Sequence, residues 1–349
     1  MNRREFLALA AAGAITLPGC ATVMPRNVAG AGPALIKPPR LKPRALVGLI
    51  APSGIVTDAT IERCVRNLEA LGFSVKTSAN IRKGWGGYAG TVKQRVDDLH
   101  AMFADREVAG LWVARGGSGA AALLPHLDYG LIARNPKILV GYSDITALHL
   151  AIQRHAGLVT FHGPGAGATQ GEYSLIHQYA MLMSPQATYR MEGSPINADR
   201  GERESAFKRV TWKGGTAEGR LTGGNLSVLT ALIGTPYSPD IRDALLCLED
   251  VSEAPYRIDR MLTHLHQSLG LDTIAGAALG VFSRCEPRDN EPSLTLREVL
   301  DQHFATSPVP AAYGLSFGHI AENLTLPFGI RARLDSGEGT LTLLEPAVS

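Results

Sequence analysis

The stretch "KILVGYSDITALHL", residues 137–150, contains one complete strand–turn–helix unit. An apolar run ends at Gly141, a Tyr-Ser-Asp turn follows, and apolar residues then recur at helical spacing. The unit is repeated upstream, where "ALVGLIAPSG" precedes "DATIERCVRNLEALGF" and "VAGLWVAR" precedes "GAAALLPHL". Strands that alternate with helices predict right-handed crossovers and a parallel sheet with both faces covered. We therefore expect an α/β fold for residues 44–184, with its chemistry at the carboxyl ends of the strands.

The rest of the chain divides into segments of different character. Its 349 residues, 45% hydrophobic and 19% charged, suit two globular domains. Residues 21–43 are rich in Pro, Gly and Ala, which predicts a flexible tether. Periodicity lapses over residues 185–206, which we interpret as a linker. Residues 207–349 mix strands and helices without strict alternation, so we expect a second domain of mixed strands and helices.

The first twenty residues, "MNRREFLALAAAGAITLPGC", have the pattern of an export signal. The apolar run is too short to span a bilayer, and the Arg3-Arg4 pair resembles a twin-arginine signal. Gly19-Cys20 resembles a lipobox, so Cys20 is a candidate for lipidation and the mature protein is expected in the periplasm. An uncleaved amphipathic N-terminus on a cytosolic protein is the alternative.

Charge and cysteine usage narrow the functional classes. A net charge of +2 without a basic run gives no footprint for nucleic acid, which favours small partners. Besides Cys20, the chain has Cys64, Cys247 and Cys285, whose spacing does not suit a metal site. We expect Cys64 and Cys247 to be small buried hydrophobic residues, with no disulfide framework.

Ser143 lies between the predicted strand and helix, and two roles are open to it. A hydroxyl there can project from a tight turn as in a nucleophile elbow, although Ile145 replaces the second glycine of G-x-S-x-G. Ser or Asp before a helix is more often an N-cap. Asp144 could cap the helix and leave Ser143 free.

A glycine-rich turn, residues 115–119, follows another predicted strand. Its glycines allow backbone amides to approach a ligand, so it predicts either an oxyanion-binding loop or a simple turn. It also fits G-x-G-x-x-A, but it follows a later strand, and Asp128 comes too soon to bind a ribose. A dinucleotide site is therefore disfavoured.

Histidines and carboxylates supply candidate bases. His162 and His319 end apolar runs and are credible site residues, whereas His264 and His266 lie two apart on a helix and make a poor metal pair. Glu249 and Asp250 close the apolar run "ALLCL", and strand alternation allows only one of them to face a site. A carboxylate there is a natural partner for an imidazole N–H.

Together these segments resemble the LD-carboxypeptidase family of serine peptidases. The resemblance rests on motifs in one order: "APSG" (51–54), "YAGTVKQRVDDL" (88–99), "ARGGSGA" (114–120), "GYSDITAL" (141–148), "TFHGP" (160–164), "GRLTGGNLSVLTALIGTPY" (219–237), "LCLEDVSEAPYRIDRML" (246–262) and "GLSFGH" (314–319). It implies a Rossmann-like N-terminal domain, a smaller, β-rich α/β C-terminal domain and a Ser-Glu-His triad divided between them.

By motif position, the resemblance implies Ser143 as nucleophile, Glu249 as orienting carboxylate and His319 as general base. The oxyanion hole would come from the backbone N–H groups of Asp144 and of the turn at Gly116 and Gly117. The implied reaction removes the terminal D-alanine of murein tetrapeptides, without metal or cofactor. A homodimer is also implied.

Four further positions are candidates for substrate binding. Arg115 and Arg257 could hold the free carboxylate of the substrate. His162 and Ser118 also belong to this set, and Ser118 departs from the tyrosine usual in the family, which could alter substrate preference.

Two alternative functions stay open within this resemblance. One is hydrolysis of peptidyl or acyl-nucleotide amides, as in microcin self-immunity relatives. The other is a lipoprotein that binds muropeptides without cleaving them, against which the intact Ser, Glu and His argue.

Overall fold

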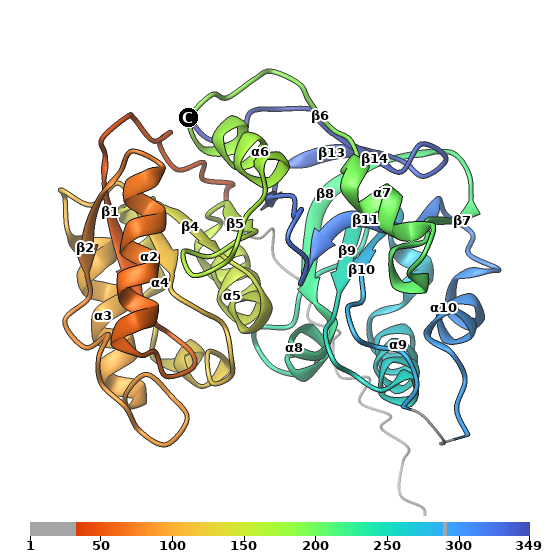
Figure 1. Ribbon diagram of the computed structural model, residues 1–349, viewed down its shortest axis with the longest axis horizontal. Coiled ribbons are helices and arrows are strands. Elements are labelled where there is room, and N and C mark those ends of the chain that lie inside the picture. The colour runs from red at the N-terminus through yellow and green to blue at the C-terminus, as the bar shows by residue number, and fades with distance from the viewer. Residues whose placement is uncertain (1–32, 289–291) are drawn as a thin grey trace, which may run out of the picture. The chain divides into compact units, whose positions relative to one another are not determined.

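The computed structural model describes residues 33–288 and 292–349. The predicted export signal, Cys20 and residues 21–32 of the predicted tether lie outside the described residues. Two sheets organise the described chain, and helices alternate with the parallel strands (Figure 1). The predicted α/β fold class is confirmed.

The first sheet has six strands in the order β12-β5-β4-β3-β1-β2. Five are parallel, and β12, from far along the chain, is antiparallel to β5. The strands are β1 (Leu46–Ile50), β2 (Ser74–Thr77), β3 (Gly110–Val113), β4 (Ile138–Gly141), β5 (Thr160–His162) and β12 (Leu326–Phe328). The helices are α2 (Asp58–Ala70), α3 (Val92–Ala104), α4 (Tyr129–Arg134), α5 (Thr146–Ala156) and α6 (Glu172–Leu182), with 3-10 turns η1 (Ala121–His126) and η2 (Ser143–Ile145).

Local chemistry explains these elements. Every residue of β3 and β4 is buried, as both faces of a covered parallel sheet require. A capping box joins Thr91 and Gln94 at the start of α3. The predicted helix after Gly119 is only the 3-10 turn η1, and it contains Pro125, which lacks the amide that a longer helix would need.

The second sheet has eight strands in the order β6-β14-β13-β8-β9-β10-β11-β7. Its four central strands, β8 to β11, are parallel, and the outer ones pair antiparallel. The strands are β6 (Tyr189–Met191), β7 (Val210–Lys213), β8 (Thr216–Asn225), β9 (Ala244–Glu249), β10 (Gly276–Val281), β11 (Ala311–Gly318), β13 (Arg331–Asp335) and β14 (Thr340–Leu343). The helices are α7 (Pro195–Gly201), α8 (Leu226–Ala231), α9 (Pro255–Leu269) and α10 (Leu296–Phe304), with 3-10 turns η3 (Ser205–Phe207) and η4 (Leu271–Thr273).

The segment predicted as a linker, residues 185–206, is instead part of the second sheet. Strand β6 pairs with β14, and Ser194 caps α7. The Asn197 side chain is buried and donates to the carbonyl of Glu322 over 2.8 Å. The periodicity lapses because β6 has three residues and α7 has seven, which is too short for a repeating apolar pattern.

The predicted tether is wrong for its last part. Ile36 bridges to Leu158, Leu41 is buried, and the Arg40 N–H donates to the carbonyl of Ser349 over 2.9 Å. Composition indicated flexibility, but apolar residues between the prolines pack on the body of the protein. No helix in the described ranges is long and apolar enough to cross a membrane.

Candidate active site

Ser143 occupies the turn between β4 and α5, at the carboxyl end of the parallel sheet. Its backbone is left-handed, with φ of 66°, which is costly for a residue with a Cβ. The residue at the N-cap of α5 is Ile145, and no side chain caps either this helix or η2. Ser143 is therefore not a helix cap, and its strained backbone is typical of a nucleophile elbow.

The glycine-rich turn after β3 lies directly against Ser143. A Cβ at Gly116 would come within 2.9 Å of the Ser143 Cβ and 3.1 Å of its Oγ. The Gly116 carbonyl accepts from the Gly54 N–H over 3.3 Å, so the "APSG" loop supports this turn from behind. A glycine at position 116 is therefore required by its close approach to Ser143.

The Asp144 side chain holds the loops together instead of capping a helix. Its Oδ2 accepts from the Ser53 hydroxyl over 2.6 Å and from the Ala120 N–H over 2.9 Å. The buried Arg95 guanidinium adds bonds to the carbonyls of Pro52 and Gly119. Burial lowers the pKa of Arg95, and the nearby Asp144 carboxylate opposes this shift. These contacts fix the turn beside Ser143.

Glu249 and His319 form a buried pair at the ends of β9 and β11. His319 Nδ1 lies 2.7 Å from Glu249 Oε2, and the glutamate is fully buried whereas the imidazole is 16% exposed. Gly318 has φ of 124°, and a Cβ there would lie 3.3 Å from Oε2. The carboxylate thus fixes the ring and leaves its other nitrogen available for chemistry.

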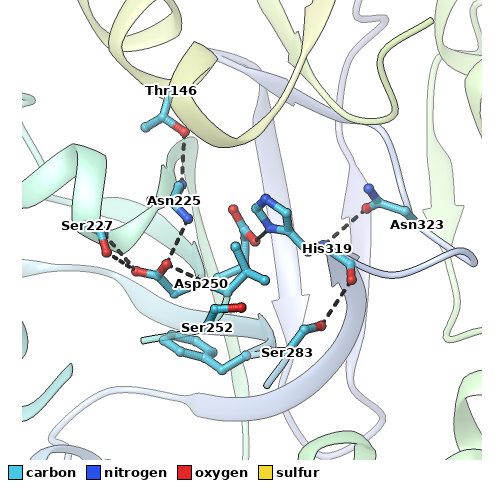
Figure 2. Close-up of polar contacts among 12 residues, drawn as sticks. Thr146, Asn225, Ser227, Asp250, Ser252, Ser283, His319 and Asn323 are labelled. Carbon is cyan, nitrogen blue, oxygen red and sulfur yellow. Dashed lines mark hydrogen bonds and ion pairs between the residues drawn. The ribbon is translucent and has the colours of Figure 1, made fainter. Parts of the chain in front are cut away.

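Asp250 points away from His319, as strand alternation predicts for the second of two adjacent carboxylates. Figure 2 shows its carboxylate between Asn225 and Ser227, and Asn225 reaches Thr146. Burial raises the pKa of Asp250 to about 6, against the hydrogen bond from Ser227. Since Thr146 begins α5, this network links the turn at Ser143 to the strand that carries Glu249.

The two groups of candidate residues meet at Tyr142. Its ring centroid lies 4.8 Å from that of His319, and Ser143 follows Tyr142 in the chain. No hydrogen bond joins Ser143 Oγ to His319 among the described residues. Catalytic hydrogen bonds are often long in unliganded proteins and tighten when substrate binds.

His162 ends strand β5, as predicted, but it is fully buried behind Glu249 and presents no exposed surface to a substrate. Arg115 and Ser118 are exposed on the glycine-rich turn. Arg115 also lines a cavity of about 190 Å³ beside Gly116 and Tyr142.

Arg257 is also exposed. It lines a separate hollow of about 640 Å³ and pairs with Glu253 over 3.6 Å. Arg115 thus lies on the turn that contacts Ser143, whereas Arg257 lines a different hollow.

The last group of candidate residues comprises possible metal ligands and the three cysteines. Within residues 33–288 and 292–349, no cluster of three or more His, Cys, Asp or Glu side chains could hold a metal ion. Cys64, Cys247 and Cys285 are free and buried, and burial raises the pKa of each thiol, for Cys64 to about 11.

Comparisons with known proteins agree with this architecture. The family model for the LD-carboxypeptidase N-terminal domain matches residues 47–163, and that for the C-terminal domain matches residues 218–334. The chain belongs to the LD-carboxypeptidase family. It is therefore a carboxypeptidase of mixed α/β fold, as the resemblance implied.

Individual relatives cover nearly the whole chain. A probable murein peptide carboxypeptidase of Bacillus subtilis is 36% identical over 88% of this chain and 95% of its own length. The murein tetrapeptide carboxypeptidase of Pseudomonas aeruginosa is 33% identical over 83% of this chain and 92% of its own. The solved MccF-like protein of Bacillus anthracis is 29% identical, with a TM-score of 0.77 over 89% of this chain and 99% of its own.

Several residues that build the site carried no sequence signal for that role. Ser53 and Arg95 act through loops distant in sequence, and Thr146 and Asn225 act across the two sheets. The "TGGN" stretch carries one usable signal, because adjacent glycines indicate a close approach of the backbone. In the structure, a Cβ at Gly224 would come within 2.5 Å of the Thr146 hydroxyl oxygen.

Proposed function

We propose that this protein is a serine L,D-carboxypeptidase that removes the terminal D-alanine from murein tetrapeptides. The observation that carries the proposal is the buried Glu249–His319 pair, at 2.7 Å, beside the left-handed turn of Ser143. The names of the relatives from Bacillus subtilis and Pseudomonas aeruginosa support murein peptides as the substrate class.

In the proposed reaction, Ser143 Oγ attacks the carbonyl of the L-configured diamino acid while His319 accepts its proton. Glu249 keeps the imidazole in the tautomer that has Nδ1–H and stabilises the imidazolium. His319 then protonates the amine of the departing D-alanine. Water hydrolyses the acyl-enzyme by the same steps.

The oxyanion of the tetrahedral intermediate would be held by backbone N–H groups of Asp144 and of the turn at Gly116 and Gly117. This placement is supported by the contact distance between Gly116 and Ser143. Donors fixed before the reaction stabilise developing charge at little reorganisation cost. Arg115 is the better placed of the two predicted arginines to attract the free carboxylate, because it lines the hollow beside Gly116.

The test is release of D-alanine from purified muropeptides. We expect release from tetrapeptide but not pentapeptide, unaffected by a chelator, and a loss of about 10³-fold or more in Ser143→Ala. Ser238→Ala is the matched control, since that side chain joins no hydrogen bond among the described residues. Full activity in Ser143→Ala would refute the proposal.

A second candidate is hydrolysis of acyl-nucleotide amides, which the likeness to the MccF-like structure favours. The same assay with an aminoacyl sulfamoyl nucleoside distinguishes the two. Cleavage of that compound without D-alanine release from tetrapeptide would select the second function. Binding of muropeptides without any cleavage would instead indicate the non-catalytic lipoprotein.

We also propose that the protein is exported to the periplasm, lipidated at Cys20 and dimeric. The support is the Arg3-Arg4 pair, the Gly19-Cys20 dipeptide and the family resemblance. Mass spectrometry of the mature N-terminus and light scattering of the purified protein test these points. An unprocessed Met1 in the native host, or a monomer at micromolar concentration, would contradict them.

A further inference from the structure

His162 is a buried polar side chain without any polar partner. It is fully buried, and neither Nδ1 nor Nε2 has a hydrogen-bond partner among the described residues. A buried imidazole normally satisfies at least its N–H group, so this residue requires an explanation.

Glu249 Oε1 is another buried atom without a hydrogen-bond partner, and it faces His162. Glu249 Oε2 accepts from His319, but Glu249 Oε1 has no partner and lies 3.9 Å from His162 Nε2. Both side chains are fully buried. A buried carboxylate normally accepts several hydrogen bonds, and among the described residues its only ion-pair partners within 4 Å are these two histidines.

The ring of His162 is held in this position by its neighbours. It stacks on Phe328 with centroids 5.3 Å apart and an interplanar angle of 21°, and β12 pairs with β5 at His162 itself. His149 and Tyr142 close two more sides, with centroids 6.1 and 6.5 Å away. These three rings thus surround His162, and its Nε2 lies on the side of Glu249 Oε1.

We infer that His162 is a positioning residue that acts through Glu249, an inference that rests on the proposed function. Its Nε2–H closes onto Glu249 Oε1 when substrate binds, so that one carboxylate oxygen is held by each histidine. The closure shortens the present separation by about 1 Å to reach hydrogen-bond distance. No proton leaves His162. The N–H fixes the carboxylate while His319 exchanges protons with Ser143 and the leaving group.

The electrostatic surroundings suit a neutral donor. Burial, with the neighbouring His149 and His319, holds the pKa of His162 well below its ordinary value. The titratable groups that face it are Tyr142, His149, Glu249 and His319. A neutral imidazole can donate to Oε1 without adding a second positive charge beside His319.

Loss of the His162 N–H donor is expected to shift the pH profile of kcat/KM in one direction. Without the N–H, the Glu249–His319 pair as a unit binds its proton more tightly, whichever partner holds it. The acid limb of kcat/KM then moves to higher pH. A purely structural role for His162 would change stability and leave this limb in place.

The variants to compare are His162→Phe, which keeps an aromatic ring but removes the donor, and His162→Gln, whose Nε2 can replace the imidazole Nε2–H. We expect His162→Phe to lower kcat about tenfold or more, with little change in KM and an upward shift of the acid limb. We expect His162→Gln to recover most of the rate and the wild-type limb. Assays use the muropeptide tetrapeptide and the full mature chain.

His177→Gln is the matched control, because His177 is also a buried histidine packed on an aromatic ring but faces Tyr173 and Tyr189. It should leave the pH profile unchanged. A folded His162→Phe with wild-type kcat and limb would overturn the inference. So would a folded His162→Gln as impaired as His162→Phe.

The wild-type protein gives a test that needs no variant to fold. Histidine ¹⁵N resonances report which ring nitrogen carries the proton, and we expect His162 to be neutral and protonated at Nε2 from mildly acidic to alkaline pH. A tautomer protonated only at Nδ1 would refute the inference. Failure of the wild type to release D-alanine would count against the proposed function, whereas wild-type release with unaltered variants would count against His162 alone.

Discussion

At the scale of single residues, the backbone of Ser143 is a strained feature of the site. A non-glycine residue with φ of 66° is strained, and the surrounding loops maintain it through Asp144, Ser53 and Arg95. Ser143 thus adopts a conformation that its own side chain disfavours, which exposes the hydroxyl on a sharp turn.

The strain predicts an order of stability between two inactive variants. Ser143→Gly and Ser143→Ala both lack the hydroxyl, but alanine keeps the Cβ that the left-handed region disfavours. We expect Ser143→Gly to be more stable than Ser143→Ala by about 1 kcal/mol, measured by urea unfolding. A more stable alanine variant would show that the turn is not strained.

Asp250 predicts a pH dependence of stability. Its pKa rises on folding from the ordinary 3.8 to about 6, so the folded state favours the protonated carboxyl. This contribution is complete below the unfolded pKa and is lost as pH rises through the folded pKa. As pH rises from about 4 to about 7, we expect the Tm difference, wild type minus Asp250→Asn, to decrease.

A Tm difference that stays constant over this range would contradict the raised pKa of Asp250. Asp97→Asn is a suitable comparison, because Asp97 is exposed on α3, pairs with Lys93 and lies outside the buried network.

At the scale of elements, the turn after β3 and the turn after β4 are built as one unit. Gly116 brings its backbone against Ser143, and Gly54 supports it from a third loop. All three loops follow parallel strands, so they meet at one edge of the sheet.

Gly116→Ala tests this contact. The new Cβ would lie 2.9 Å from the Ser143 Cβ, so one turn must move. We expect a loss of about tenfold to a hundredfold in kcat in the D-alanine assay, because the proposed oxyanion donor and the proposed nucleophile are displaced together. Gly87→Ala is the control, since a Cβ there meets nothing within 4 Å. Equal activity of both variants would contradict the arrangement.

The elements also show how far the sequence can be interpreted. Alternating apolar runs and helical spacing predicted β1, β3, β4, α2 and α5, because long periodic patterns report burial directly. Strands β6 and β12 have three residues each and carry no such signal. Their positions depend on partners that are distant in the chain.

The candidate site divides in the same way. The local pattern made Ser143, Glu249 and Asp250 candidates because each follows or ends an apolar strand, and the family resemblance then selected Ser143 and Glu249. The burial of His162 and the role of the Asp144 side chain depend on neighbours from other loops, so no pattern in "TFHGP" or "GYSD" predicted them.

At the scale of the whole molecule, the proposed nucleophile and base come from different sheets, and a path of polar contacts links the segments that carry them. The Thr146 hydroxyl is buried and accepts from the Asn225 N–H over 2.9 Å, and Asn225 binds Asp250 next to Glu249 (Figure 2). This path sets where the Glu249–His319 pair lies relative to Ser143.

Thr146→Val removes the hydroxyl at nearly constant volume. The Asn225 N–H then stays buried without an acceptor, which costs about 1–3 kcal/mol of unfolding free energy. We also expect lower kcat, since the segment that carries Ser143 loses a contact to the second sheet. Thr146→Ser keeps the acceptor and should retain both stability and rate. Chemical unfolding and D-alanine release check the two effects, and a Thr146→Val protein equal to Thr146→Ser would contradict them.

Strand β12 has a consequence for any attempt to split the chain. It belongs by sequence to the second half but occupies the outer edge of the first sheet, beside β5. A fragment ending near residue 184 would leave the edge of β5 unpaired. An unpaired strand edge can pair with another copy of the chain and so promotes self-association. We expect that fragment to precipitate when produced alone and to become soluble when co-expressed with residues 185–349, which makes the protein a candidate for fragment complementation.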